Sequence, residues 1–254
     1  MRRVSTLATV TLVVLALSAG IARAITFGTP DGSTHPYVVL VALYSGQTYE
    51  GRCSGSLLSP TLVLTAAHCM QELGANRARV FTDPTVTDDL ATTTKGVVGT
   101  PMAHPAFTDL SALPNTSDLA VVVLQSPVRV ARYATVGPVG AADGIEGTQL
   151  TAVGYGVQAV KPKVLEEKIR FFSNPFVTNL DSKLTAGWNI ETTNDKKTGG
   201  TCFGDSGGPM LLPGTDTVLA VISFGKNTTC KGHDYGYRVD TTYAQAWLAN
   251  FPLG

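Results

Sequence analysis

Three short segments carry side chains that together could attack a carbonyl group: His68 in "LTAAHC", Asp118 in "DLAVVVL" and Ser206 in "GDSGGP". A serine hydroxyl is a weak nucleophile at neutral pH and needs an adjacent base. An imidazole can serve as that base because its pKa lies near neutrality. A carboxylate would then hold the imidazole in one tautomer and stabilise its protonated form. The three residues therefore form a chemically complete set for nucleophilic catalysis.

Each of these residues also has an ordinary structural interpretation. Asp118 could be a turn residue or a cap at the start of a strand, and Ser206, flanked by Asp205 and two glycines, could belong to a simple turn. A single histidine is more often a packed or solvated residue than a catalyst. We assign that ordinary interpretation to the remaining histidines, which are His35, His104 and His233.

The elements that position these residues are predicted to be strands. Short Val-rich apolar runs alternate with turns of Gly, Pro, Asn and Thr along most of the chain. Such runs occupy residues 37–44, 62–64, 119–124, 150–153 and 218–223. A helical period is clear only over residues 241–250, where Asp240 or Thr241 could act as the N-cap. Residues 127–142 are the best candidate for a linker. The pattern predicts an all-β body with one C-terminal α-helix.

Residues 1–24 have the features of a secretory signal peptide. Arg2 and Arg3 precede an uncharged apolar run over residues 7–21, and "ARA" at 22–24 fits a signal-peptidase cleavage pattern. The run is too short to favour a membrane span. We therefore expect a secreted, extracellular protein that has no membrane association once the signal is removed. An uncleaved anchor is the alternative.

The mature chain of 230 residues would suit one large all-β domain or two small ones. Removing the three arginines of residues 1–24 leaves 16 basic and 19 acidic residues, a net charge of −3. The sequence has no cluster of Lys and Arg interleaved with aromatic residues, so nothing supports nucleic-acid binding. Four cysteines in an exported protein suggest two disulfides, with three possible pairings.

The order His, Asp, Ser and the surrounding motifs resemble the chymotrypsin-like (trypsin-fold) secreted serine peptidases over essentially all of residues 25–254. The supporting segments include "CSGSLLSPTLVLTAAHC" (53–69), "GYG" (154–156) and "SFG" (223–225). The resemblance implies two packed antiparallel six-stranded Greek-key barrels, over about 25–136 and 137–240, with a helix at about 241–250. It also implies the disulfides Cys53–Cys69 and Cys202–Cys230.

The same resemblance gives roles to the residues around Ser206. Gly204 and Ser206 are the expected backbone donors of an oxyanion hole, and a glycine at 204 can adopt the conformation that this role needs. The buried carboxylate of Asp205 would pair with the free α-amino group of Ile25 after cleavage. Because Ala24 precedes Ile25, signal peptidase itself would make that terminus. The chain departs from the family's usual start at Thr26 and Phe27.

The substrate pocket is assigned to Gly200, Thr201, Ser223 and Gly225. A neutral residue at 200 disfavours cleavage after Arg or Lys, so we expect a neutral or apolar P1 residue, the residue whose carbonyl is attacked. The segment "KGHDYGYRVD" (231–240) matches the family pattern poorly, and we expect Tyr235 or Gly236 to line the far wall. Ser223–Gly225 should pair with extended substrate as an added strand.

We therefore expect a serine endopeptidase that forms an acyl-enzyme and acts on protein and peptide substrates. Protein inhibitors are further expected partners, and we expect a monomer that needs no cofactor or metal. A calcium site at Asp83, Asp88 and Asp89 is conceivable, but their spacing matches no ligand pattern. The main alternative is a non-catalytic, protein-binding homologue. An esterase of the α/β-hydrolase type is disfavoured because its triad runs Ser, Asp, His.

Overall fold

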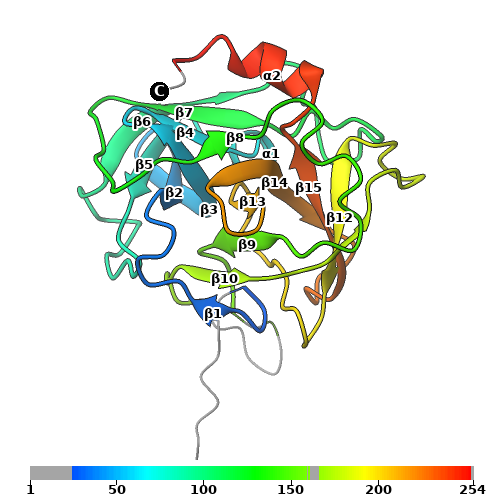
Figure 1. Cartoon of the computed structure of the whole chain (residues 1–254). Coiled ribbons are helices and arrows are strands. Elements are labelled where there is room, and N and C mark those ends of the chain that lie inside the picture. The colour runs from blue at the N-terminus through cyan, green and yellow to red at the C-terminus, as the bar shows by residue number, and fades with distance from the viewer. Residues whose placement is uncertain (1–24, 159, 161–165, 253–254) are drawn as a thin grey trace, which may run out of the picture.

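The structure is a computed structural model of the whole chain, and it describes all residues except 1–24, 159, 161–165 and 253–254. The predicted signal peptide therefore lies outside the described residues. The described chain is mostly β-structure with two short helices, and its strands form two sheets that lie side by side (Figure 1). No helix among the described residues has the length and apolar character that a membrane crossing requires.

The first sheet is a closed six-stranded barrel whose strands follow the order β2-β3-β4-β7-β6-β5. All its neighbouring strands are antiparallel. Buried Val and Leu side chains, most of them from β2, β4 and β7, fill its core, because these three strands are almost entirely apolar. The strands are β2 (Val38–Ser45), β3 (Thr48–Ser59), β4 (Leu62–Thr65), β5 (Arg77–Phe81), β6 (Val97–Ala103) and β7 (Ala120–Leu124).

The second sheet is barrel-like but open. Its main path runs β1-β10-β9-β13-β14-β15-β12-β11, and β8 pairs in parallel with β14. The strands are β1 (Thr29–Pro30), β8 (Thr135–Val136), β9 (Thr151–Gly154), β10 (Phe171–Ser173), β11 (Val177–Asn179), β12 (Asn189–Asn194), β13 (Pro209–Leu211), β14 (Thr217–Gly225) and β15 (Gly232–Arg238). The predicted two-barrel fold is confirmed, with nine strands in place of six in this open second half.

The N-terminal segment belongs to the second sheet, because β1 pairs with β10. Arg170 fastens this segment to both halves of the molecule. Its fully buried guanidinium donates to Asp31 Oδ2 at 2.7 Å, to Val38 O at 2.8 Å and to Tyr155 Oη at 3.1 Å. Such a buried charge is tolerated only when it is paired and fully hydrogen-bonded. The start of the described chain is therefore held in one place.

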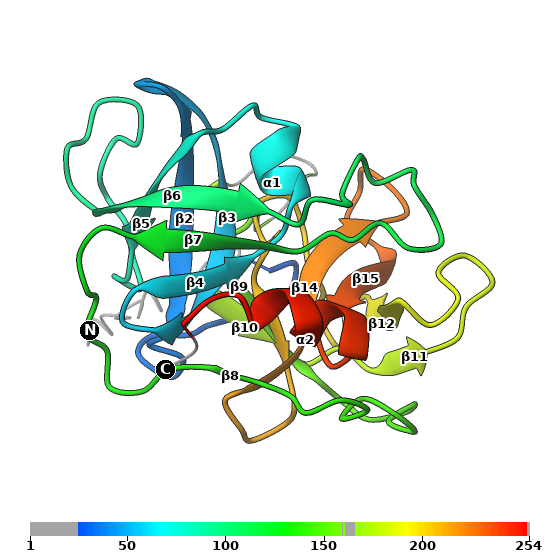
Figure 2. The same ribbon diagram turned by 90° about the horizontal axis from the view of Figure 1, so that it is seen from above.

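Two helices complete the fold. The short α1 (His68–Gln71) directly follows β4, and it lies beside β6 at the boundary between the two halves (Figure 2). The C-terminal α2 (Thr242–Leu248) begins at the N-cap Thr241, whose side chain accepts a hydrogen bond from Ala244 N. Its buried residues Ala244 and Leu248 join the hydrophobic cluster that fills the first barrel and extends into the second half. The predicted C-terminal helix is therefore present, with Thr241 as the cap.

Candidate active site

His68 and Asp118 meet at the boundary between the two halves. His68 opens α1, and Asp118 precedes β7, the strand that pairs with β4. His68 Nδ1 lies 2.8 Å from Asp118 Oδ2, and the backbone N–H of His68 donates to Asp118 Oδ1 at 2.9 Å. The carboxylate is fully buried. The two bonds fix the ring orientation and place the Nδ1 proton toward Asp118, which leaves Nε2 as the basic nitrogen.

The second half supplies one further contact to this carboxylate. Ser223 Oγ, on β14, donates to Asp118 Oδ2 at 2.5 Å. Burial alone would raise the pKa of Asp118, but the hydrogen bonds and charge of His68 and the bond from Ser223 lower it below its usual value. Burial also acts to lower the pKa of His68, but the charge of Asp118 and its hydrogen bond raise it, with a smaller contribution from Glu72. These two shifts indicate that Asp118 is ionised and that the imidazole beside it is more basic than a free one.

Ser206 lines the same cleft as His68. This cleft has a volume of about 310 Å³ and also includes Thr201, Ser223 and Gly225. No hydrogen bond joins Ser206 Oγ to His68 among the described residues; in substrate-free sites such bonds are often long and tighten on binding. Gly200 and Gly204 do not line this cleft, and Asp118 lies behind His68.

The backbone amides around Ser206 are used unequally. The N–H groups of Asp205, Gly207 and Gly208 donate to Cys202 O, Ile222 O and Asp205 O. Within the described chain the N–H groups of Gly204 and Ser206 donate to no protein acceptor. Gly204 has φ +92°, a conformation open to glycine. Two unpaired donors thus belong to the nucleophile candidate itself and to the residue two positions before it.

Close packing explains why residue 207 is a glycine. A Cβ at this position would lie 2.1 Å from Thr65 Oγ1 and 2.3 Å from Ser54 O, and φ is +82°. Ser54 reaches across the same boundary, since its N–H donates to Ser206 O at 2.8 Å and its Oγ to Gly204 O at 2.9 Å. The first barrel therefore holds the Ser206 loop in position.

Two disulfides brace the site, and they have the pairing that the family resemblance implies. Cys53–Cys69 ties β3 to α1, next to His68, and Cys202–Cys230 ties the Ser206 loop to the segment between β14 and β15. Among the described residues, one group of potential metal ligands lies close together: Cys53, His68 and Cys69. Both cysteines in it are disulfide-bonded, so this cluster offers no thiolate for a metal.

Asp205 is fully buried, and its oxygens accept hydrogen bonds from Gly156 N at 2.8 Å and from Cys202 N at 2.9 Å. Burial raises its pKa to about 7, although these two bonds oppose the shift. Ile25 is also fully buried, and Thr26 forms an antiparallel bridge with Gly200. In the whole chain the nitrogen of Ile25 is an amide bonded to Ala24, so it cannot carry the charge of a terminal amine.

Sequence reasoning missed Asp234, a buried carboxylate on β15 that lines the cleft. Asn194 Nδ2 donates to both of its oxygens, at 3.0 and 2.9 Å, and Thr201 N donates to Oδ2 at 2.6 Å. Burial raises its pKa to about 6. Alternation along β15 was the signal that could have found it, since neighbouring side chains on a strand point to opposite faces.

Tyr235 and Gly236, which we expected at the far wall of the pocket, do not line the cleft. Tyr235 stacks on Phe224 with ring centroids 4.7 Å apart, and a Cβ at Gly236 would lie 2.5 Å from Met210 Sδ. Gly200 also has a neighbour that the sequence does not reveal. A Cβ there would lie 2.1 Å from Asn194 Cγ, so the Asn194 side chain occupies the space beside this residue.

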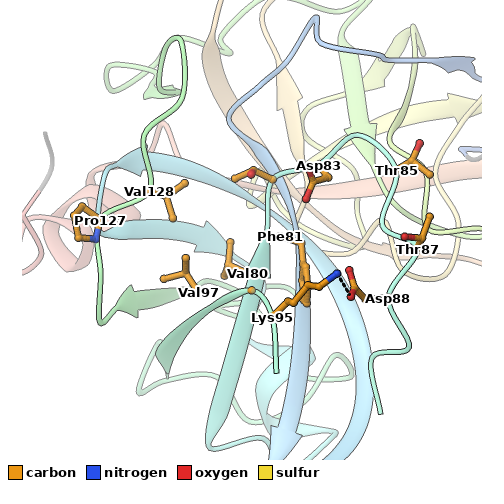
Figure 3. Close-up of a pocket in the computed structure, with 12 residues that line it drawn as sticks. Val80, Phe81, Asp83, Thr85, Thr87, Asp88, Lys95, Val97, Pro127 and Val128 are labelled. Atoms are coloured by element: carbon orange, nitrogen blue, oxygen red, sulfur yellow. Dashed lines mark ion pairs between the residues drawn. The ribbon is translucent and has the colours of Figure 1, made fainter. Parts of the chain in front are cut away.

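A separate cavity of about 620 Å³ lies on the first barrel (Figure 3), and neither His68 nor Ser206 lines it. Val80, Val97 and Val128 form its apolar part. The aspartates considered for calcium lie at or near its polar rim. Asp88 pairs with Lys95 at 2.9 Å, and Asp89 accepts hydrogen bonds from Ala91 N and Thr92 Oγ1. The carboxylates of Asp88 and Asp89 are thus engaged with neighbouring groups of the chain.

The fold and this site define a class of protein, the trypsin-fold serine peptidases. The Trypsin family model matches residues 27–248, so the chain belongs to the trypsin family and is a serine-type endopeptidase. Brachyurin from Leptuca pugilator is 30% identical over 203 residues, which cover 77% of this chain and 85% of the relative. Trypsin alpha from Drosophila erecta is 24% identical over 209 residues, which cover 77% of this chain and 76% of the relative.

Two solved structures share the fold. A structure titled HL collagenase has a TM-score of 0.72 at 20% identity, and the match covers 89% of this chain and 98% of the other. The scabies mite inactivated protease paralogue S-D1 has a TM-score of 0.69 at 18% identity, covering 89% and 97%. Likenesses at this identity show the fold alone. The second title also shows that a protein with this fold can be inactivated, so activity must be argued from the residues of this chain.

Proposed function

We propose that Ser206 is the nucleophile, His68 the general base and Asp118 the residue that orients and stabilises the imidazole. The observation that carries this proposal is the 2.8 Å bond from His68 Nδ1 to Asp118, with His68 and Ser206 in one cleft. In the first step His68 Nε2 takes the Ser206 proton as Oγ bonds to the substrate carbonyl carbon. His68 then gives that proton to the leaving amine, and water hydrolyses the resulting acyl-enzyme.

The unpaired N–H groups of Gly204 and Ser206 support a role as the oxyanion hole. As Ser206 attacks, negative charge develops on the carbonyl oxygen, and preorganised donors stabilise that charge. Removing one such donor costs about 10²–10³ in kcat in an enzyme that uses the same device. The positive φ of Gly204, a conformation open to glycine, would allow its N–H to face the site.

Activation would depend on the new N-terminus at Ile25. The amine of a chain cut after Ala24 would supply the charge that the buried Asp205 lacks, since the elevated pKa of Asp205 near 7 reflects an uncompensated site. The bridge between Thr26 and Gly200 supports this proposal, because it holds the segment next to Thr201, a residue of the cleft. Secretion and activation would then be one event, and the mature enzyme would act outside the cell.

The P1 pocket would be formed by Thr201, Ser223 and Gly225, which line the cleft, with Gly200 next to Thr201. The neutral residue at 200 favours neutral or apolar side chains. Asp234 provides the observation for a second candidate, a basic P1 residue, because its carboxylate lines the cleft and its pKa near 6 leaves it ionised at neutral pH. Three hydrogen bonds already occupy its oxygens, which weakens its attraction for a cation. We therefore retain the neutral or apolar preference as the leading proposal.

The expected substrates are proteins and peptides that enter the cleft in extended form. The enzyme is expected to act as a monomer. Protein inhibitors that fit the same cleft are expected partners. The alternative function is a protein-binding module without activity. A fluorophosphonate probe separates the two: correctly processed protein should be labelled, and Ser206→Ala should not. Unlabelled processed protein would favour the binding module.

A further inference from the structure

Apart from the catalytic candidate His68, the residues that line the active-site cleft carry acidic charge but no basic charge. Glu72 and Asp234 are both among them, and no Lys or Arg of the described chain is. Asp234 lies on β15 in the second half, whereas Glu72 follows α1 in the first. The two carboxylates would therefore act on different parts of a bound peptide, and the function proposed above considers only Asp234.

Glu72 lies one helical turn beyond His68. Its backbone N–H donates to His68 O at 3.0 Å, and residues four apart share one face of a helix. The side chain is exposed, and within the described residues no ion pair or side-chain hydrogen bond engages its carboxylate. Its charge also helps to raise the pKa of His68, which places it within electrostatic range of the imidazole. Glu72 is therefore free to meet a substrate.

The chemistry decides which side of the cleaved bond Glu72 faces. The P1 side chain enters the pocket formed by Thr201, Ser223 and Gly225 from the second half. The leaving amine takes its proton from His68, so the peptide beyond the cleaved bond must pass His68 on the side of the first barrel. Glu72, on the same helix face as His68, lies on this leaving-group side.

We propose that Glu72 forms a subsite for a cationic side chain, Lys or Arg, at the first or second residue after the cleaved bond. This inference deepens the proposed function and rests on it. An exposed carboxylate and a cation attract each other modestly, and such pairs correspond to about a two- to fivefold gain in kcat/KM. Salt screens the attraction, so the gain falls as ionic strength rises.

The test uses internally quenched peptides with one fixed P1 residue and neutral residues elsewhere. A single Lys is moved through each position from three residues before the cleaved bond to three after, and each peptide has a Gln counterpart. For the wild-type enzyme the Lys/Gln ratio of kcat/KM should be about two to five at the first or second position after the bond. It should approach one in Glu72→Gln and fall below one in Glu72→Lys.

The matched control is Glu146→Gln, which changes an exposed glutamate outside the cleft and should keep the wild-type ratio. The ratio compares two peptides on one enzyme, so partial misfolding of a variant does not alter it. A ratio unchanged in Glu72→Gln, or a Lys preference only before the bond, would overturn the subsite while leaving the peptidase intact. No cleavage of any peptide by processed enzyme would overturn the proposed function and the subsite together.

Discussion

The carboxylate of Asp118 accepts hydrogen bonds from His68 through both of its oxygens, from the backbone N–H at 2.9 Å and from the ring Nδ1 at 2.8 Å. One fully buried side chain thereby fixes both the place of α1 and the tautomer of the imidazole. Asp118→Asn would keep the shape of this contact but could present its NH₂ group to Nδ1, which favours the wrong tautomer. We expect kcat to fall by about 10⁴, with little change in KM. Steady-state kinetics on a peptide ester or amide measures both constants, and a loss below tenfold would contradict this role.

The pH dependence of activity should report the titration of His68. The imidazole is basic only when neutral, and its pKa is raised above the usual 6.5. Activity should therefore rise with pH through a midpoint above 6.5 in kcat/KM. Removing the charge of Glu72 takes away one cause of the shift, so Glu72→Gln should move the midpoint to lower pH. A midpoint that moves upward in this variant would contradict the assignment.

Asp205 should make the uncut chain less stable as pH rises. Its folded pKa of about 7 lies above the usual 3.8, so the folded state holds this proton more tightly than the unfolded state. The protonated Asp205 therefore contributes its full stabilisation below about pH 4. This stabilisation, on the order of a few kcal/mol, is lost as pH rises toward 7. Urea unfolding of the Ser206→Ala chain with Ala24 retained should show this loss, and adding Asp205→Asn should remove it.

The processed chain should behave differently, because its Ile25 amine can pair with Asp205. One extra residue before Ile25 should displace that amine and reduce kcat at least 100-fold while leaving the thermal unfolding temperature within a few degrees. A matched chain that begins at Ile25 is the control. Full activity of the extended enzyme would show that activation does not depend on this amine.

Asp234 should decide how far the pocket accepts a basic P1 residue. We expect wild-type enzyme to prefer apolar P1 residues and to cleave after Lys or Arg more slowly. Asp234→Asn should lower kcat/KM for basic P1 peptides about tenfold or more while affecting apolar ones less, because only the former lose an ion pair. Glu191→Gln is a control, since Glu191 also faces basic groups but lies outside the cleft. Peptides with P1 Lys and Leu, compared in parallel, give the answer.

The sequence predicts the parts of this molecule that are encoded in local patterns. The apolar runs predict strands, and the motifs around His68, Asp118 and Ser206 place three distant segments in one site. What the sequence could not show depends on contacts between distant residues. The Asn194 side chain fills the space beside Gly200, and Asp234 turns into the cleft because of the register of β15 with β14. The nine strands of the second half likewise include β1, which pairs with β10, and β8, which pairs with β14. Each of these two strands is only two residues long.

The central claim is that Ser206 becomes covalently acylated during turnover. Processed enzyme should be mixed with an activated ester such as a p-nitrophenyl ester of a peptide, and the released p-nitrophenol and the intact mass should be followed together. The account predicts a burst of one equivalent of p-nitrophenol and a mass increase of one acyl group, mapped to Ser206 after acid quench and digestion. Turnover without a burst or acyl adduct, or an adduct on another residue, would contradict it.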